Sequence, residues 1–325
     1  MSRPWTVPPV IKASALLHAG AALGTVAVPA VWPWALGAVA LNHAVITVAG
    51  LLPRSSLLGP NLTRLPAHSQ ARRELALTID DGPDPEVTPR VLDLLDVAGA
   101  QASFFCIGWR ARAHPALCRE IVARGHRVEN HGDSHSNAFS LFGPRRMRAD
   151  VAAAQATLSD ITGQAPLFFR PTAGLRNPFL EPVLAGLDLQ LAAWTRRPYD
   201  TRDGRPQQVL QRLIRGLGPG DILLMHDGHA ALTPDGQPVI LATLPLLLDR
   251  LKAESLRAVT LQQAVGKRLG AEAGGADIEH HEHPAIGFQR PHPGTIGQHC
   301  ADQVTALAIG LAHRVDGLVA RGLRP

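Results

Sequence analysis

Short apolar runs alternate with longer amphipathic stretches through the middle of the chain, between Glu74 and Leu261. The short runs are rich in Leu, Ile, Val and Phe, and several lead directly into Asp, Gly, Pro or His, which is typical of buried β-strands that end at a turn. We therefore predict strands at the following positions: Leu75–Ile79, Ser103–Ile107, Arg127–Glu129, Leu167–Arg170, Leu189–Trp194, Ile222–Met225 and Ala258–Leu261.

The amphipathic stretches between these strands carry apolar residues at helical spacing. An alternation of about seven strands with helices predicts an α/β fold, in which parallel strands form an open sheet or a barrel under covering helices. No glycine-rich fingerprint for dinucleotides or phosphates follows the first strand, so a nucleotide-binding fold has no support. The predicted helices are Val87–Ala98, Ala113–Ala123, Arg145–Ile161, Gln207–Arg215 and Leu241–Ala253.

The N-terminal segment has a different pattern, because the 41 residues from Ala13 to Pro53 include no charged side chain. A membrane-spanning helix needs about 20 apolar residues, so this segment suffices for two short spans, at 13–31 and 34–53. Pro and Trp residues at its midpoint interrupt the helix and favour a membrane–water interface. We therefore expect a transmembrane helical hairpin. The alternative, a cleaved signal peptide ending near Ala27–Ala30, leaves the second apolar run unexplained.

Charge is distributed unevenly along the chain, which has a formal net charge of +5. Residues 1–73 contain six Arg and Lys residues and no acidic residue, so the remainder holds 26 basic and 27 acidic residues. Because the body is nearly neutral and aromatic residues make up only 4% of the chain, we expect no nucleic-acid partner. The basic residues that flank the apolar segment predict a membrane-anchored protein with both ends of the hairpin in the cytoplasm. They are Arg3, Lys12, Arg54 and Arg64.

These patterns divide the chain into four parts. Residues 268–325 begin with a stretch rich in Gly, Ala, His and Pro and end with helical spacing over Ala301–Leu323. The three cysteines form no CxxC pair, which argues against a disulfide scaffold and against a cysteine zinc site. We expect a membrane anchor at 1–53, a linker at 54–73, a catalytic domain at 74–267, and a low-complexity linker with an amphipathic helix at 268–325.

Two adjacent carboxylates, Asp80 and Asp81, follow the first predicted strand and precede a Gly-Pro turn. In a β/α fold the carboxyl ends of the strands form the functional edge, so one carboxylate is suited to metal binding and the other to proton transfer. His131 and His135 follow the third strand at a spacing that lets both imidazoles bind one metal. With Asp81 they make a two-His, one-carboxylate set that leaves positions for water and substrate.

Two further strands end in side chains suited to the same site. Arg170 follows two aromatic residues and needs a carboxylate partner, for which Asp80 is a candidate. His226 ends an apolar strand and is suited to act as a general acid. Each feature alone also occurs in ordinary surface turns, but their succession at the ends of consecutive strands is specific.

With these motifs the chain resembles the polysaccharide deacetylase family, also called carbohydrate esterase family 4 or the NodB homology domain, over about residues 74–262. The family motifs T-F-D-D-G, H-[ST]-x-x-H, R-P-P-Y-G and L-x-H-D are similar to T-I-D-D-G at 78–82, H-G-D-S-H at 131–135, R-P-T-A-G at 170–174 and L-M-H-D at 224–227. The resemblance implies a distorted (β/α) barrel, often with seven strands.

The resemblance also implies catalytic roles. Asp80 would be the general base, Arg170 would hold Asp80, and His226 would protonate the leaving amine. A family motif of Trp followed shortly by Asp implies a carboxylate that orients this histidine. The spacing here is unusual and offers two candidates, of which we favour Asp200 over Asp203.

The resemblance also implies which residues bind the metal and which contact the substrate. A divalent metal would be bound by Asp81, His131 and His135; zinc is the usual ion, with Co²⁺, Mn²⁺ and Ni²⁺ as alternatives. The substrate would be contacted by Trp194, by Leu224 at the acyl methyl, and by the backbone N–H near Ala173. Thr172 and Ala173 replace the Pro and Tyr of the family motif, which opens that wall of the pocket.

The function that follows is metal-dependent hydrolysis of an N-acyl group, in the first place acetyl, on an amino sugar. With a membrane anchor, the expected partners are the membrane and a carbohydrate that is either a glycan or a lipid-linked saccharide. A cytoplasmic catalytic domain favours a lipid-linked precursor, whereas an exported one favours peptidoglycan or another N-acetylglucosamine polymer. The alternatives are a catalytically inactive glycan-binding or scaffold member and a deformylase or amidase that acts on a lipid-linked sugar.

Overall fold

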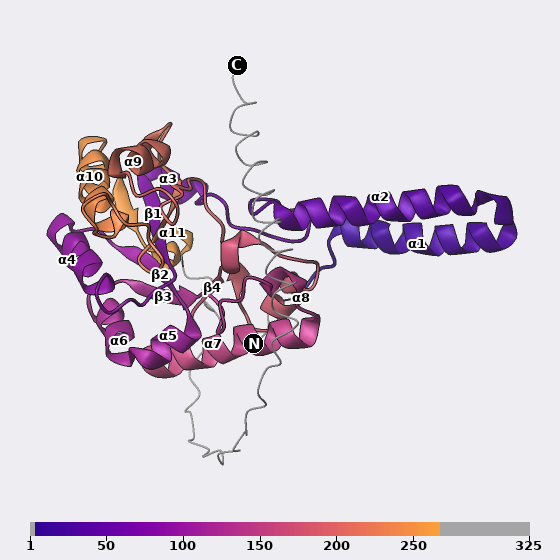
Figure 1. Cartoon of the computed structure of the whole chain (residues 1–325), viewed down its shortest axis with the longest axis horizontal. Coiled ribbons are helices and arrows are strands. Elements are labelled where there is room, and N and C mark those ends of the chain that lie inside the picture. Colours follow the sequence, from indigo (N-terminus) through magenta and orange to yellow (C-terminus); the bar gives the residue numbers. More distant parts are fainter. Residues whose placement is uncertain (1–3, 267–325) are drawn as a thin grey trace, which may run out of the picture.

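The computed structural model describes residues 4–266, which form a curled sheet covered by helices, with a helical hairpin projecting from one side (Figure 1). The strand order is β5-β4-β3-β2-β1-β6, and β7 pairs with the first half of β1. Every ladder in this sheet is parallel. The strands are β1 (Glu74–Asp80), β2 (Ala102–Cys106), β3 (Arg127–Asn130), β4 (Phe168–Phe169), β5 (Gln190–Leu191), β6 (Ile222–His226) and β7 (Arg257–Val259).

The sheet curls toward a barrel whose last gap is bridged by irregular chain. Residues 192–196 continue from β5, and the amide of Ala192 donates to the Phe169 carbonyl of β4 at 3.0 Å. Three residues later the amide of Thr195 donates to the Ile222 carbonyl of β6 at 2.8 Å. The curled parallel sheet confirms the predicted fold class. Because the chain crosses from β4 to β6 here, β5 is a two-residue strand, shorter than predicted.

Side chains of β1 alternate between the two faces of the sheet. The outward-facing residues join the main apolar cluster beneath the helices; they are Leu75, Leu77 and Ile79. The inward-facing residues line the barrel interior; they are Ala76, Thr78 and Asp80. Strand β6 shows the same alternation, because Leu223 and Met225 face outward and Leu224 faces inward. This two-residue period aims the last residues of both strands, Asp80 and His226, at the interior.

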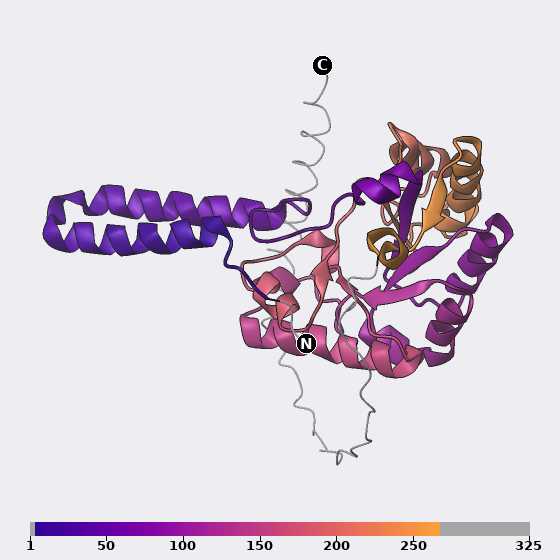
Figure 2. The ribbon, with the colours of Figure 1, turned by 180° about the vertical axis from the view of Figure 1, so that it is seen from behind.

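The longer helices of the domain cover the outer face of the sheet (Figures 1 and 2). The five helices predicted for this domain are present as α4 (Thr88–Ala98), α6 (Pro115–Ala123), α7 (Pro144–Thr162), α9 (Pro206–Ile214) and α10 (Val239–Ala253). Four helices that were not predicted have at most six residues, too few for a periodic pattern: α3 (Ala67–Ala71), α5 (Gly108–Ala113), α8 (Leu180–Ala185) and α11 (Leu261–Val265). Short 3₁₀ turns are η2 (Phe139–Leu141) and η3 (Thr172–Gly174).

Two long apolar helices form the projecting hairpin, α1 (Pro9–Ala27) and α2 (Trp32–Leu51), joined by η1 (Pro29–Val31). They run side by side in both ribbon views (Figures 1 and 2). Both are long and apolar enough to cross a membrane, as the sequence predicts, although composition and length alone carry that statement. The base of the hairpin contacts the sheet domain, where the amide of Arg176 donates to the carbonyl of Gly50 at 3.1 Å.

The segment predicted as a linker, residues 54–73, packs against the domain. Leu58 and Leu65 are buried, and the amide of Leu62 donates to the carbonyl of Leu191 in β5 at 3.0 Å. The segment therefore covers one edge of the sheet. The predicted C-terminal linker and helix at 268–325 lie outside the described residues.

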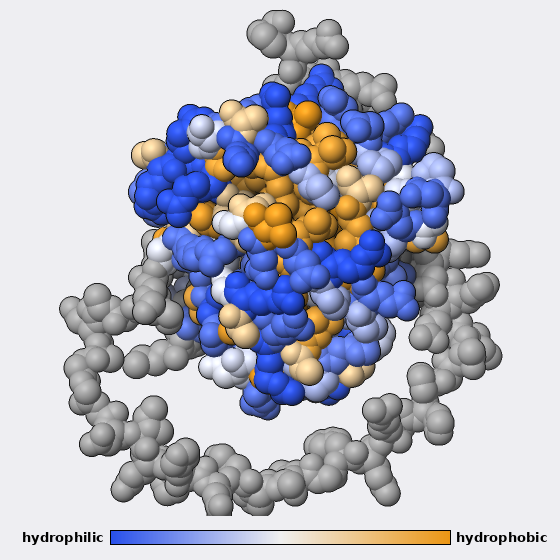
Figure 3. Space-filling view, turned by 90° about the vertical axis from the view of Figure 1, so that its left-hand side faces the viewer, coloured by the Kyte–Doolittle hydropathy of each residue, from blue (hydrophilic) through white to orange (hydrophobic). Residues whose placement is uncertain are grey.

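The two ends of the barrel carry different hollows. At the amino ends of the strands, between α4 and α10, lies a hollow lined by apolar residues such as Leu94, Val97 and Leu248 and by charged residues such as Asp249 and Lys252. Apolar side chains gather on this face of the molecule (Figure 3). The carboxyl ends of the strands instead surround a polar pocket, which is the candidate active site.

Candidate active site

Strand register brings the predicted site residues together. Asp80 and His226 are direct partners in the β1–β6 ladder. His131 directly follows β3, and Arg170 directly follows β4. Because neighbouring parallel strands end at the same edge, four side chains that are distant in sequence meet at one end of the barrel.

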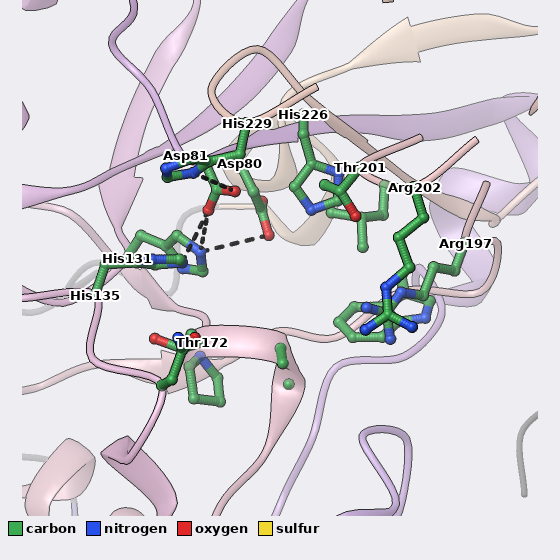
Figure 4. A pocket seen from close by; sticks show the side chains of 16 residues that line it. Asp80, Asp81, His131, His135, Thr172, Arg197, Thr201, Arg202, His226 and His229 are labelled. Carbon is green, nitrogen blue, oxygen red and sulfur yellow. Dashed lines mark hydrogen bonds and ion pairs between the residues drawn. The ribbon is translucent and has the colours of Figure 1, made fainter. Parts of the chain in front are cut away.

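These residues surround one pocket of about 330 Å³ (Figure 4). All residues predicted to bind metal or substrate line it, together with two of the predicted catalytic residues: Asp80, Asp81, His131, His135, Ala173, Trp194, Leu224 and His226. Arg170 and Asp200 lie behind this lining and hold Asp80 and His226. Further lining residues that the sequence analysis did not select include Asn137, Thr172, Arg197, Thr201, Arg202 and His229.

Arg170 is buried behind Asp80 and orients it. Its Nη1 donates to Oδ1 of Asp80 at 2.6 Å and to the Thr78 hydroxyl at 2.9 Å. Its Nε and Nη2 donate to the backbone carbonyls of Ala192 and Ala193, and the guanidinium lies 4.1 Å from the ring centroid of Phe105. A buried cation with these partners fixes one carboxylate oxygen of Asp80 and leaves the other directed toward the pocket.

His226 is held by Asp200, whereas Asp203 is engaged elsewhere. Oδ1 of Asp200 lies 2.8 Å from Nδ1 of His226, and Oδ2 accepts the His226 amide at 2.8 Å. Burial alone would lower the pKa of His226, but the carboxylates of Asp200, Asp81 and Asp80 outweigh it and raise the pKa to about 9. His226 is therefore protonated at neutral pH, as a general acid requires.

The donor atoms expected for a metal converge on Asp81. Its Oδ1 lies 3.1 Å from Nε2 of His131 and 3.0 Å from Nε2 of His135. Burial alone would raise the pKa of Asp81, but its contacts with His131, His135 and His229 hold that pKa well below its usual range. One carboxylate oxygen and two imidazole nitrogens are ligand types that suit a zinc ion.

A third histidine, His229, also reaches Asp81 and was missed in the sequence. Its Nδ1 lies 3.2 Å from Oδ2 of Asp81, and its ring stacks on His135 at 5.8 Å between centroids. The candidate ligand atoms of Asp81, His135 and His229 all lie within 4.8 Å of one another. The available signal was its position three residues after His226, in the turn that follows β6.

Hydrogen bonds on the far side of each ring separate the roles of His131 and His229. Nδ1 of His131 lies 2.7 Å from the backbone carbonyl of Arg170. It must donate to that oxygen, so in the neutral ring Nε2 is the nitrogen whose lone pair is available to a metal. Nε2 of His229 lies 3.3 Å from Nη2 of Arg110. Because a guanidinium only donates, Nε2 of His229 accepts and Nδ1 carries the proton toward Asp81.

Backbone strain is concentrated at this pocket. Four of its non-glycine residues adopt the left-handed conformation: Asp81 (φ 74°), His135 (φ 48°), Ala173 (φ 55°) and His229 (φ 58°). Such conformations cost about 1–3 kcal/mol each and persist where the surrounding structure enforces them, often at active sites. Here they turn side chains from four separate loops toward the same space.

Known proteins resemble this chain in sequence and in fold. Residues 67–192 match the family model described as polysaccharide deacetylase, a range that includes the Asp-Asp, His-xxx-His and Arg-Pro motifs and ends before Asp200 and His226. A peptidoglycan-N-acetylglucosamine deacetylase of Bacillus cereus is 32% identical over 191 residues, which is 58% of this chain and 86% of that protein.

Two further relatives agree with this likeness. A chitooligosaccharide deacetylase of Azorhizobium caulinodans is 30% identical over 161 residues, or 49% of this chain and 76% of that protein. The solved structure of a family 4 carbohydrate esterase from Streptomyces lividans in complex with acetate aligns with a TM-score of 0.52 and 29% identity, over 57% of this chain and 91% of that one.

Proposed function

This chain belongs to the polysaccharide deacetylase family, whose members are hydrolases that cleave carbon–nitrogen bonds other than peptide bonds. We propose that it removes an N-acyl group, most simply acetyl, from an amino sugar in a metal-dependent reaction. The sugar belongs to a glycan or to a lipid-linked saccharide. The observation that carries this proposal is the convergence on one pocket of Asp80 with Arg170, of Asp81 with two histidines, and of His226 with Asp200.

Asp81, His131 and His135 would hold the metal, with zinc as the first candidate and Co²⁺, Mn²⁺ or Ni²⁺ as alternatives. Held by these residues, a divalent ion would supply Lewis-acid chemistry, which polarises an acyl carbonyl and makes water more acidic. His131 is prepared for this role because its Nδ1 is engaged by the Arg170 carbonyl. The two carboxylates thus have separate tasks, since Asp81 faces the histidines and Asp80 faces Arg170.

Asp80 accepts a proton from the water that attacks the acyl carbon. Arg170 restrains one of its oxygens, so the other is presented to the pocket at a fixed angle. His226 then donates its Nε2 proton to the amine nitrogen as the carbon–nitrogen bond breaks, and Asp200 stabilises the imidazolium through Nδ1. Leu224 and Trp194 supply apolar walls for the acyl methyl and the sugar, and the backbone N–H of Ala173 donates to the developing oxyanion.

The hairpin would anchor the enzyme in a membrane, with both of its ends and the catalytic domain in the cytoplasm. The absence of charge from Ala13 to Pro53 and the basic residues on either side support this arrangement. A reporter enzyme fused after residue 325 tests it, because a reporter active only in the periplasm or outside the cell would reverse the orientation.

Acetate release tests the reaction. The full chain, purified in detergent with zinc, should release acetate from N-acetylglucosamine oligomers or from a lipid-linked N-acetylated sugar. Asp80→Asn should retain zinc binding and lose turnover, because Asp80 accepts the proton while Asp81 holds the metal. Absence of acetate and formate release from every acylated amino sugar, with zinc bound, would contradict the proposal.

A further inference from the structure

The pocket carries two arginines that the proposed reaction does not use. We infer that Arg197 and Arg202 form a subsite for a phosphate group on the substrate, so that the enzyme acts on an acylated amino sugar that bears a phosphate. This inference rests on the proposed function and specifies its substrate class. Both arginines line the pocket, and Figure 4 shows them across it from His131 and His135.

Arg202 is a solvent-exposed cation at the pocket. The nearby carboxylates are engaged by other groups, because Asp200 contacts His226 and Asp203 contacts Arg205 at 2.8 Å. Arg212 also contacts Asp203 at 2.8 Å. Within residues 4–266, no ion pair therefore neutralises Arg202, and its charge faces the pocket and the solvent.

Arg197 is held in place by aromatic rings. Its guanidinium carbon lies 5.2 Å from the ring centroid of Trp194 and 5.2 Å from that of Tyr199. These cation–π contacts fix the guanidinium plane and hold the positive charge of Arg197 at a defined place beside the pocket. Since Trp194 also lines the pocket, a sugar that contacts its ring lies close to this cation.

One short segment, 197–203, carries the two arginines and the carboxylate that holds His226. It is braced by Tyr199, which has a φ of 60° and whose carbonyl accepts the amides of Arg202 and Asp203 at 3.0 Å each. A substrate phosphate at the arginines therefore has a defined position relative to the general acid. Arginine suits phosphate because its planar fork can donate two hydrogen bonds at once.

The location of the pocket favours a phosphate that joins the sugar to a membrane lipid. Pro53, two residues beyond the end of α2, packs against Gly174 in the pocket wall, since a Cβ at Gly174 would lie 2.7 Å from the Cβ of Pro53. On the same side, Nη1 of Arg54 lies 3.5 Å from the carbonyl of Thr195. The base of the apolar hairpin thus abuts the pocket. With the hairpin in a membrane, as proposed above, the pocket would lie near the membrane surface, where lipid phosphate groups are located.

Two matched substrate pairs test this inference with the full chain and zinc. In solution the pair is N-acetylglucosamine 1-phosphate and N,N′-diacetylchitobiose. In phosphatidylcholine vesicles it is a long-chain alkyl N-acetylglucosaminyl phosphate and the corresponding alkyl N-acetylglucosaminide. We expect kcat/KM to be about 10-fold or more higher for the phosphate member, since hydrogen bonds to a charged group are worth that much.

Variants that remove the charge of Arg197 or Arg202 test whether these two residues cause the preference for the phosphate-bearing substrate. Arg202→Gln and Arg197→Gln should each lower kcat/KM for the phosphate member by about 10-fold, mainly through KM, and change it less than about 2-fold for the neutral member. Arg90→Gln, at an exposed arginine on α4 outside the pocket, should change neither. A phosphate preference in both pairs assigns recognition to phosphate itself, and one confined to the vesicle pair assigns it to a lipid phosphodiester.

The inference is overturned if both members of each pair react equally, or if the arginine variants slow both members equally. In either case the proposed deacylase function still stands, because acetate is released. Failure of all four substrates to release acetate would instead count against the proposed function.

Discussion

The two carboxylate oxygens of Asp81 have different partners. Oδ1 faces the Nε2 atoms of His131 and His135, and Oδ2 faces Nδ1 of His229. Because Arg110 fixes Nδ1 of His229 as the protonated nitrogen, His229 acts as a donor to Asp81 and leaves only Oδ1 for a metal. Asp81 would then bind as a single-oxygen ligand and keep coordination positions open.

His229→Ala should weaken zinc binding by about 10- to 100-fold, the usual cost of losing a hydrogen bond that orients a ligand. Competition with a chromogenic chelator measures that affinity. His229→Gln, whose amide can still donate to Asp81, should recover part of it. X-ray absorption should count two imidazole ligands in both the natural protein and His229→Ala; three in the natural protein would mean that His229 binds the metal directly.

Asp200 controls the protonation of His226. Activity falls as the pH rises through the pKa of His226, because only the imidazolium can donate a proton. Asp200→Asn removes the neighbouring negative charge that helps to raise this pKa to about 9, so the alkaline limb of kcat/KM should move to lower pH by about one to two units. A pH–rate profile of the zinc-loaded enzyme measures the shift.

Asp203→Asn is the matched control for this prediction, because Asp203 contacts Arg205 and Arg212 and not His226. Its alkaline limb should coincide with that of the natural enzyme. Equal shifts in both variants would mean that the general electrostatics of the segment, and not the Asp200–His226 contact, set the pKa.

Among single residues, the sequence was sufficient to predict those whose residue type and position at a strand end both suit a catalytic or metal-binding role. Asp80, Asp81, His131 and His226 each stand at or directly after the end of a strand. His229 and Arg202 were not identified, because their role depends on turns whose left-handed residues bring distant loops together. Resemblance supported Asp200 over Asp203, but only the fold shows which carboxylate reaches the histidine.

Among the elements, β4 depends on a side chain for its pairing. It has two residues and a single register pair with β3, between Asn130 and Phe169. The buried carboxylate of Glu129 supplies further bonds, because it accepts the amides of Leu167 and Phe168 at 2.8 and 2.9 Å. This side chain therefore helps to place Arg170, the residue that follows β4.

Glu129→Ala should lower the free energy of unfolding by about 1–3 kcal/mol for each amide left without a partner and reduce turnover as Arg170 loses its position. Denaturant unfolding and acetate release measure the two effects. Glu129→Gln retains one acceptor oxygen and should lose less. Stability of Glu129→Ala equal to that of the natural protein would show that the backbone ladder suffices for β4.

The contribution of Glu129 to the stability of the fold also depends on pH in a defined way. Burial raises the pKa of Glu129 from its ordinary value of 4.5 to about 7. The folded state therefore holds this proton more tightly than the unfolded chain, so the contribution of Glu129 to stability falls as the pH rises from about 4.5 to 7. Glu129→Gln should remove this part of the pH dependence.

Helices and strands with a sustained hydrophobic periodicity could be predicted from the sequence. Elements whose length or packing depends on contacts with neighbouring elements could not. The long helices and the hydrophobic strands β1 and β6 follow from periodicity. Strand β5 is short because its chain is shared between β4 and β6, which no local pattern encodes. Likewise the polar composition of 54–73 indicated a linker, although Leu58 and Leu65 are buried against the domain.

For the whole molecule, charge and apolar composition indicate the hairpin but not how it joins the catalytic domain. The sequence shows that the basic excess flanks the apolar segment. The structure adds that the base of α2 meets the domain at Gly50 and that Pro53 reaches the pocket wall at Gly174. The hairpin and the site are therefore neighbours in space, which makes the position of the hairpin relevant to access of a membrane-bound substrate under the proposed function.

Gly50→Ala tests this connection, with Gly37→Ala as a control in the same helix. A Cβ at Gly50 would lie 2.2 Å from the carbonyl oxygen of Arg176, whereas one at Gly37 meets nothing within 4 Å. Alanine is the better helix former at both positions, so only the contact with Arg176 distinguishes the two variants.

Gly50→Ala should break the Arg176–Gly50 hydrogen bond and lower the stability of the full chain by about 1–3 kcal/mol. It should also reduce turnover of a vesicle-bound substrate more than that of a soluble one. Gly37→Ala should leave all three unchanged or slightly raise stability. If the two variants behave alike, the hairpin is joined to the domain only as a tether, and its contact with the domain has no part in delivering substrate to the pocket.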